Sequence, residues 1–88
     1  MMTKEKIMEA ARREIEIALK VNEEHPIDWD SVFMSRCEAH TVWVFAMNLY
    51  VDMDREEDYF TIQNRFETEW DKVYNPQWWA ILDKLPRH

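Results

Sequence analysis

Cys37 and His40 are the first residues whose chemistry and spacing suggest a site, because they lie three positions apart. On a helix this spacing places both side chains on one face, where they could share a metal ion. A zinc site needs three or four such ligands, and the other residues on the same face of this helix are apolar. We therefore expect no metal and no cofactor, with His40 a buried, hydrogen-bonded histidine and Cys37 a small core residue. The apolar neighbours on that face are Phe33, Val44 and Met47.

A run of acids near the middle of the chain is the second candidate. Its members are Asp52, Asp54, Glu56, Glu57 and Asp58. They alternate in the manner of a calcium-binding loop, which requires glycine at its sixth position and a bidentate glutamate at its twelfth. This chain has Glu57 and Gln63 at those positions. The sequence therefore predicts no calcium site.

The segment from Asp52 to Asp58 also resembles a short piece of the all-helical chorismate mutases, which set an Arg–Glu pair against a dicarboxylate substrate. The resemblance implies a small helical enzyme as an alternative to a binding protein. That family needs several cations that converge from a long first helix, whereas here Pro26 interrupts the first helix and Arg36 lies at a different spacing. The negative charge of the chain would also repel a dianion, so no residue of that family is carried over.

The composition of the chain excludes several kinds of site. It has 88 residues, no glycine and one cysteine. So short a chain forms one domain, residues 1–88, with a radius of gyration of about 12 Å if compact. Phosphate-binding and dinucleotide-binding loops need glycine at fixed positions, and a small glycine-free bundle rarely offers an oxyanion site, so we expect no catalytic residue. A single cysteine forms no internal disulfide, which predicts a reducing, cytoplasmic location.

Charge and hydropathy exclude two further classes of function. The formal net charge is −7, which disfavours direct binding to nucleic acid because such binding depends on Lys and Arg neutralising phosphates. The longest apolar run, from Val42 to Val51, is broken only by Asn48 and is about half the length needed to span a bilayer. We expect neither a nucleic-acid contact nor membrane insertion.

Hydrophobic periodicity predicts a first helix over residues 3–23, with Thr3 as its N-cap and Pro26 beyond its end. A third helix follows the acidic run. Asn75 and Pro76 end that helix and start a short fourth one. The inward stripe of the third helix is Tyr59, Ile62, Phe66, Trp70 and Val73.

The second helix begins at Asp28 or Asp30 and runs to about Val51. A strand from Thr41 to Val51 is the alternative, because large and β-branched residues alternate there, but no second strand-like run could pair with it. The fold class is therefore all-α, a compact bundle of three long helices and a short C-terminal helix. The inward stripe of the second helix is Phe33, Cys37, His40, Val44, Met47 and Val51.

The second half of this helix is apolar nearly all round, since Val42, Phe45 and Leu49 lie opposite the inward stripe. We call these three residues the apolar strip. The other helices cover about two thirds of the circumference of the second helix. Either the short fourth helix or the same strip of a second copy must cover the remainder, and we expect a homodimer.

Negative charge is concentrated in residues 52–71, which contain eight acids and two arginines. These acids form either a solvated face or a surface that steers a basic partner. Five tryptophans exceed what a small core readily encloses, so Trp79 and Tyr74 are candidate anchors for that partner. The expected steering residues are Asp52, Asp54, Glu56, Glu57, Asp58, Glu67 and Asp71.

Together these features predict a small acidic protein-binding module that inhibits or adapts a larger protein with a basic surface. The composition resembles that of small phage-encoded or antitoxin-type inhibitors, some of which imitate the charge of DNA. Two alternatives stay open: the small helical enzyme resembling chorismate mutase, and a purely structural homodimer subunit.

Overall fold

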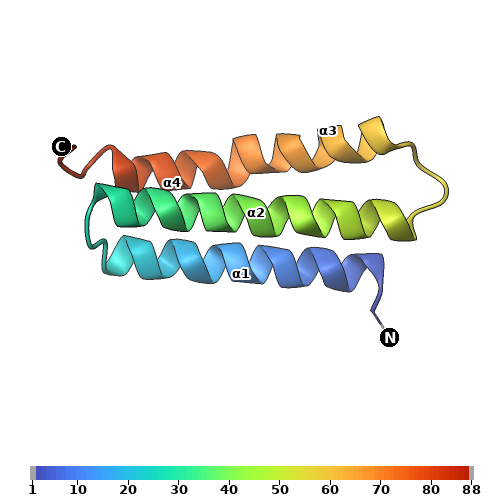
Figure 1. The fold of residues 1–88 in the computed structure, drawn as a ribbon, viewed down its shortest axis with the longest axis horizontal. Coiled ribbons are helices and arrows are strands. Elements are labelled where there is room, and N and C mark those ends of the chain that lie inside the picture. The colour runs from blue at the N-terminus through green and yellow to red at the C-terminus, as the bar shows by residue number, and fades with distance from the viewer. Residues whose placement is uncertain (1, 88) are drawn as a thin grey trace.

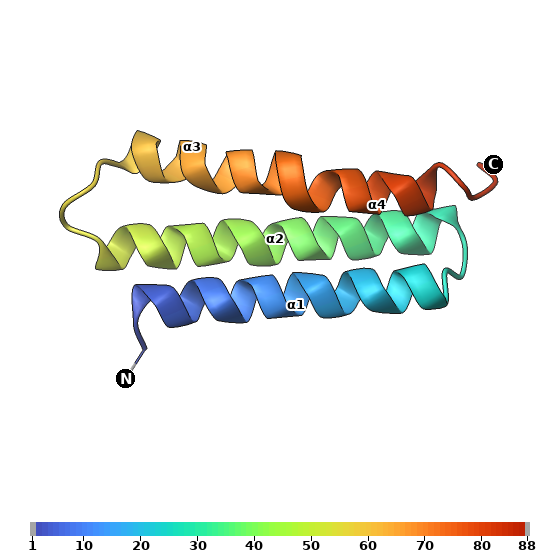
Figure 2. The same ribbon diagram turned by 180° about the vertical axis from the view of Figure 1, so that it is seen from behind.

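Three helical rods lie side by side in the computed structural model, which describes residues 2–87 (Figure 1). The middle rod is antiparallel to both of its neighbours, as the reverse view also shows (Figure 2). No strand occurs among the described residues, so the all-α prediction is confirmed and the alternative strand from Thr41 to Val51 is wrong. The elements are α1 (Lys4–Glu24), α2 (Trp29–Met53), α3 (Tyr59–Glu69), a π-helical turn η1 (Trp70–Tyr74) and α4 (Asn75–Leu82).

Side-chain caps fix where each rod begins. The hydroxyl of Thr3 accepts a hydrogen bond at 3.2 Å from the backbone N–H three residues later, as the sequence predicted. Asp28, rather than Asp30, caps α2 in the same way at 2.7 Å, and Asp58 caps α3 at 2.9 Å. Each cap satisfies a backbone donor that the helix itself leaves unpaired.

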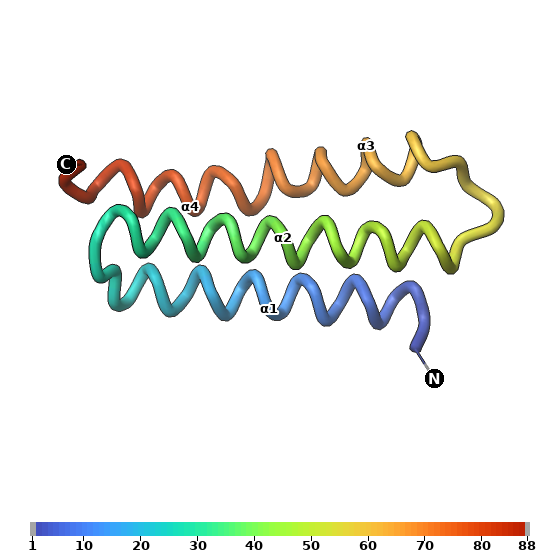
Figure 3. The backbone as a smooth tube through the Cα atoms, viewed as in Figure 1, coloured from blue at the N-terminus to red at the C-terminus, as the bar shows by residue number. Residues whose placement is uncertain are grey.

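The third rod continues without a break from α3 through η1 into α4 (Figure 3). The prediction that a short fourth helix begins at Asn75 and Pro76 is confirmed, since α4 spans Asn75–Leu82 with Pro76 in its first turn. The predicted break and the N-cap role of Asn75 are wrong, because Asn75 has helical dihedral angles of φ −56° and ψ −43°. Its backbone N–H bonds to the Trp70 carbonyl oxygen, which is the five-residue step of a π turn. Pro76 has no backbone N–H to donate to the carbonyl oxygen four residues earlier, and its ring crowds that carbonyl. The π turn therefore lies where the proline removes one α-helical hydrogen bond.

The π turn also changes which side chains face the core. With α-helical winding, Val73 follows Trp70 on the inward face, as the sequence predicted. The wider turn brings Tyr74 to that place instead, so Tyr74 is buried whereas Val73 is 46% exposed. The prediction that Val73 belongs to the inward stripe is therefore wrong.

Trp43 of α2 lies at the centre of the core. Its indole N–H donates to the Phe66 carbonyl oxygen at 2.8 Å. Its ring centroid lies 5.0 Å from that of Phe66 and 5.5 Å from that of Tyr74. This one side chain therefore joins α2 to the third rod through both packing and a hydrogen bond. The buried residues of α2 are Val32, Ala39, Trp43, Ala46 and Met47.

The inward face of α2 is not the stripe that the sequence predicted. Met47 belongs to both, but His40 and Val44 of the predicted stripe are exposed. Because α2 is apolar nearly all round, its periodicity does not distinguish one face from another. The predicted stripe lies instead on the flank of α2 that borders the third rod, with Phe33 beside α4 and with His40, Val44 and Met47 nearer to α3.

The bundle is elongated, with extents of 46 × 26 × 16 Å and a radius of gyration of 14.3 Å, which exceeds the roughly 12 Å of a compact chain of this length. The short helix α4 packs near the start of α2, where the Trp79 ring lies 6.4 Å from those of Trp29 and Phe33. It leaves the apolar strip exposed, so the alternative in which α4 covers the strip is wrong. No helix within residues 2–87 combines the length and apolar character needed to cross a bilayer.

Trp43→Phe should lower the free energy of unfolding by about 1–2 kcal/mol, because it removes buried ring atoms and a donor from a buried carbonyl. Denaturant unfolding followed by circular dichroism measures the change. Phe60→Ala is the control, since Phe60 is 75% exposed and its loss should change stability by at most about 0.5 kcal/mol. Equal effects of the two substitutions would contradict the central role of Trp43.

Candidate functional site

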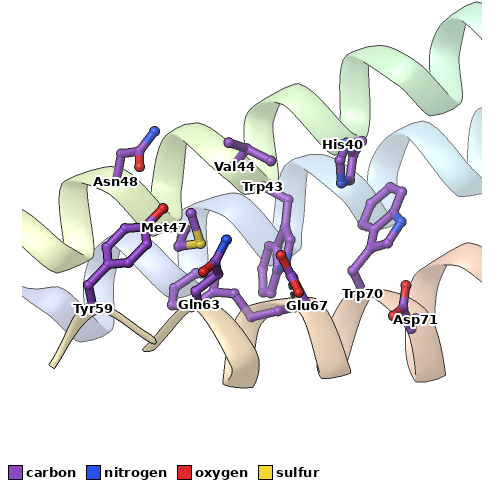
Figure 4. Close-up of a pocket in the computed structure, with 11 residues that line it drawn as sticks. His40, Trp43, Val44, Met47, Asn48, Tyr59, Gln63, Glu67, Trp70 and Asp71 are labelled. Atoms are coloured by element: carbon purple, nitrogen blue, oxygen red, sulfur yellow. Dashed lines mark hydrogen bonds between the residues drawn. The ribbon is translucent and has the colours of Figure 1, made fainter. Parts of the chain in front are cut away.

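A groove of about 400 Å³ lies between α2 and α3, on the flank of α2 that carries the predicted stripe. Trp43, Met47 and Phe66 are buried apolar residues of its lining. Polar side chains from both rods lie around it (Figure 4). We call it the acidic groove. Its polar lining residues are His40, Asn48, Gln63, Glu67 and Asp71.

Glu67 and Asp71 are the carboxylates of the acidic groove, one from α3 and one from η1. Both are exposed, and neither takes part in an ion pair among residues 2–87. The ring of Trp70, between them in sequence, lies 4.8 Å from the imidazole of His40 across the groove (Figure 4). Unpaired carboxylates beside aromatic rings suit a cationic side chain.

Asp54, which the sequence predicted to steer a partner, is only 7% exposed. Its carboxylate accepts hydrogen bonds from the backbone N–H groups of Glu56 and Glu57 at 2.8 and 3.1 Å and from the Lys4 ammonium group at 3.1 Å. The two backbone hydrogen bonds, followed by Lys4, lower the pKa of Asp54 to about 2. Asp54 is therefore not available to a partner, and instead joins the α2–α3 turn to the start of α1.

Two other predicted steering residues are also used within the fold. Asp58 caps α3, and hydrogen bonds from Thr61 lower its pKa. Glu57 is half-buried and pairs with Arg65 at 3.1 Å. Asp52, at the end of α2, and Glu56, in the α2–α3 turn, are exposed and outside the ion pairs of the described residues.

The two predicted anchors are also held by the fold. Tyr74 is buried, and its hydroxyl donates to a Glu69 oxygen at 3.1 Å. Burial, and then the charge of Glu69, raise the pKa of Tyr74 to about 12. Trp79 is half-buried, with the Arg36 guanidinium 5.7 Å from its ring centroid. Tyr74 is thus unavailable as an anchor. Trp79 is only partly accessible, because its ring packs against those of Trp29 and Phe33.

Glu69 also ties α1 to the third rod. The Nε and Nη2 atoms of Arg12 donate to its two carboxylate oxygens, each at 2.8 Å. This bidentate pairing lowers the pKa of Glu69 and has the geometry of the stronger charge-assisted hydrogen bonds.

Arg12 and Arg65 border a second cleft, of about 360 Å³, between α1 and the third rod. A dicarboxylate substrate of the kind implied by the chorismate mutase resemblance would need free cations here. Both guanidinium groups are instead paired with Glu69 and Glu57, and two further glutamates line the cleft. The cleft is therefore net negative and gives the enzyme alternative no support.

No group of three or more His, Cys, Asp or Glu side chains within residues 2–87 could hold a metal ion. His40 is exposed at the edge of the acidic groove, so the expectation that it is buried is wrong. Cys37 is a half-buried free thiol.

No protein-family model matches the chain, and the searches of curated proteins and of solved structures found no match either.

Two polar lining residues of the acidic groove, Asn48 and Gln63, were absent from the predicted site. Tyr59 was assigned to the inward stripe of the third helix, which is wrong, because it is 43% exposed at the groove. A signal for Tyr59 and Gln63 exists, because Tyr59, Gln63, Glu67 and Asp71 recur at intervals of four residues. Residues four apart lie on one face of a helix. This row lies next to the buried residues of α3 and η1, which are Ile62, Phe66, Trp70 and Tyr74. Asn48 has no comparable signal.

The stability of the chain should depend on pH through Asp54. Its pKa is lowered from 3.8 to about 2 on folding, so the unfolded chain binds more protons between these values. The stabilisation is therefore complete above about pH 4 and lost as the pH falls towards 2. Thermal unfolding from pH 2 to 6 should show the Tm difference between the native chain and Asp54→Asn shrinking towards zero at the acid end.

Lys4→Met is the control for this experiment, because it removes one donor to Asp54 and keeps the two backbone hydrogen bonds. It should retain most of the pH dependence. A Tm difference for Asp54→Asn that stays constant from pH 6 to 2 would contradict the assignment.

Glu69→Ala should lower the free energy of unfolding by about 2 kcal/mol, because it leaves the buried Tyr74 hydroxyl without its acceptor. Tyr74→Phe alone should cost less than about 1 kcal/mol. In the Tyr74→Phe background, Glu69→Ala should cost about 1 kcal/mol less than in the native chain. Strict additivity in denaturant unfolding would show that the Tyr74–Glu69 hydrogen bond contributes nothing.

Proposed function

We propose that this chain is a protein-binding module that inhibits or adapts a larger protein, and that the acidic groove holds a cationic side chain of that partner. One observation carries the proposal: within residues 52–71, some acids are paired inside the fold and others line the groove. Asp54, Glu57 and Glu69 are paired with cations of the chain itself. Glu67 and Asp71 line an open groove and have no such pairing among the described residues.

The lining of the groove favours arginine over lysine. A guanidinium group is planar, so it can lie against an aromatic ring and also donate to two acceptors in its own plane. Tyr59, which is 43% exposed, supplies an accessible ring, while Glu67 and Asp71 supply acceptors. A lysine ammonium group could meet one of these requirements at a time. We therefore expect the partner to present an arginine on an exposed segment.

The net charge of −7 supports long-range attraction to a basic surface. Two exposed acids add to this attraction, Asp52 at the end of α2 and Glu56 in the α2–α3 turn. Such a module would inhibit a DNA-binding protein if it occupied the surface that otherwise binds phosphates, as a DNA-charge mimic of the phage or antitoxin type does. A cytoplasmic setting suits this role and the free thiol of Cys37.

Titration with an arginine-rich probe peptide tests the groove directly. The double variant Glu67→Gln, Asp71→Asn should weaken binding about tenfold or more at low salt, because two charge-assisted contacts are lost. Added salt should weaken binding by the native chain more steeply than binding by the variant. Calorimetry gives the affinities, and the same peptide with lysine in place of arginine should bind less tightly.

Glu24→Gln with Asp83→Asn is the matched control, since it changes the net charge equally at exposed acids outside the groove. Its affinity should stay within about twofold of the native value, because general attraction is shared by all acids. An equal loss of affinity in both double variants would show that the peptide responds only to net charge and would contradict a specific role of the groove. Once a partner is captured from the native host, failure of duplex DNA to compete for it would exclude DNA mimicry.

A further inference from the structure

One face of the bundle, formed by α1 and α2, exposes large apolar side chains. The apolar strip lies in its middle, where Phe45 is 65% exposed and Val42 and Leu49 are each 37% exposed. Met34 lies three helical turns before Phe45 and extends the face towards the start of α2. The face is thus apolar well beyond the three residues of the strip.

The same face continues on α1. Ala10 and Glu14 lie beside the apolar strip across the α1–α2 junction. Ile17 and Val21 follow them by seven residues each, which is two helical turns, and both are more than half exposed. Large exposed apolar side chains therefore follow the line of both helices.

Next to Phe45 lies an apolar recess of about 170 Å³ between α1 and α2. Small side chains, Ala10, Ala11 and Ala46, make room for it. A cavity of roughly 150 Å³ accommodates a benzene ring, so a phenyl ring fits this recess. One face therefore carries both a projecting ring and a recess of matching size.

We propose that a second copy of the chain docks on this face, with Phe45 of each copy inserted into the recess of the other. A two-fold axis makes both contacts at once, because the same patch is used twice. Helices of 21 and 25 residues, each about 10 Å wide, present a face on the order of 700 Å². That is close to the roughly 800 Å² that each partner contributes to a stable interface.

The distribution of charge selects a second copy over a basic partner at this face. Among the described residues that line the recess and the adjoining cleft beside Val42, only Glu14 and Glu38 are charged, although the whole chain carries −7. Two such chains repel one another least where few charges meet. A basic partner is better suited to the acidic groove, where Glu67 and Asp71 lie beside the exposed ring of Tyr59.

This arrangement leaves the acidic groove open. The groove is lined by Val44 and Asn48, which lie on the other flank of α2 from Val42 and Leu49. A dimer therefore carries two acidic grooves, and a partner with two suitably spaced cationic segments would gain avidity from binding both.

Sedimentation equilibrium at tens of micromolar tests the proposal, with an expected mass twice the 10.9 kDa of the chain. Val42→Glu should yield a folded monomer, whereas Val44→Glu should remain a dimer. This pair is matched, because both residues are valines of α2 with 37% exposure and they differ only in flank. A monomeric native chain, or a dimer that Val44→Glu dissociates and Val42→Glu does not, would overturn the proposal.

Two uncharged variants test the ring-in-recess contact itself. Phe45→Ala should raise the dimer dissociation constant at least about thirtyfold, the usual effect of truncating a central aromatic residue. Ala10→Trp adds apolar surface but fills the recess, so it should also weaken the dimer. If Ala10→Trp dimerised more tightly than the native chain, association would depend on apolar area alone, and the insertion of Phe45 into the recess would be refuted. Circular dichroism checks that each variant keeps its helix, and Phe45→Ala decides the matter if a glutamate variant does not fold.

Discussion

The middle helix has only two neighbours, and this constraint sets the character of the molecular surface. α2 is apolar nearly all round, yet α1 and the third rod pack against only part of it. Trp43 fills the shared interior and leaves two flanks of α2 at the surface. Glu67 and Asp71 border one flank, whereas the other is bordered mainly by apolar residues of α1, with Glu14 among them. Both surface features therefore have the same origin, an apolar helix that its own chain does not fully enclose.

A chain this acidic must limit its own repulsion, and it does so by using acids where positive charge or backbone donors are available. Asp28 and Asp58 accept backbone hydrogen bonds at helix starts, where the helix dipole favours negative charge. Asp54 combines backbone donors with a lysine, and Glu69 faces an arginine. What distinguishes a structural acid from an available one is thus its neighbours in space.

Sequence reasoning succeeds here where a polar face contrasts with an apolar one. The start of α1 at its Thr3 cap followed from such contrast and from capping chemistry. The inward side of α2 did not, because residues such as Val44 and Trp43 are equally apolar and only packing separates them. In the candidate site, Glu67 and Asp71 were predicted, but nothing local told them apart from Asp54, whose partner Lys4 lies fifty residues away in sequence.

The π turn η1 has a consequence for the winding of the third rod. A regular α-helix advances about 100° per residue, so a row with a four-residue period drifts by about 40° at each step. The wider turn unwinds the rod locally and corrects the phase of its second half. If the same five residues wound as a regular α-helix, α4 would rotate by roughly 100°, the angle of one residue, and Trp78 would leave the buried row. The buried row kept in phase by η1 is Ile62, Phe66, Trp70, Tyr74, Trp78 and Leu82.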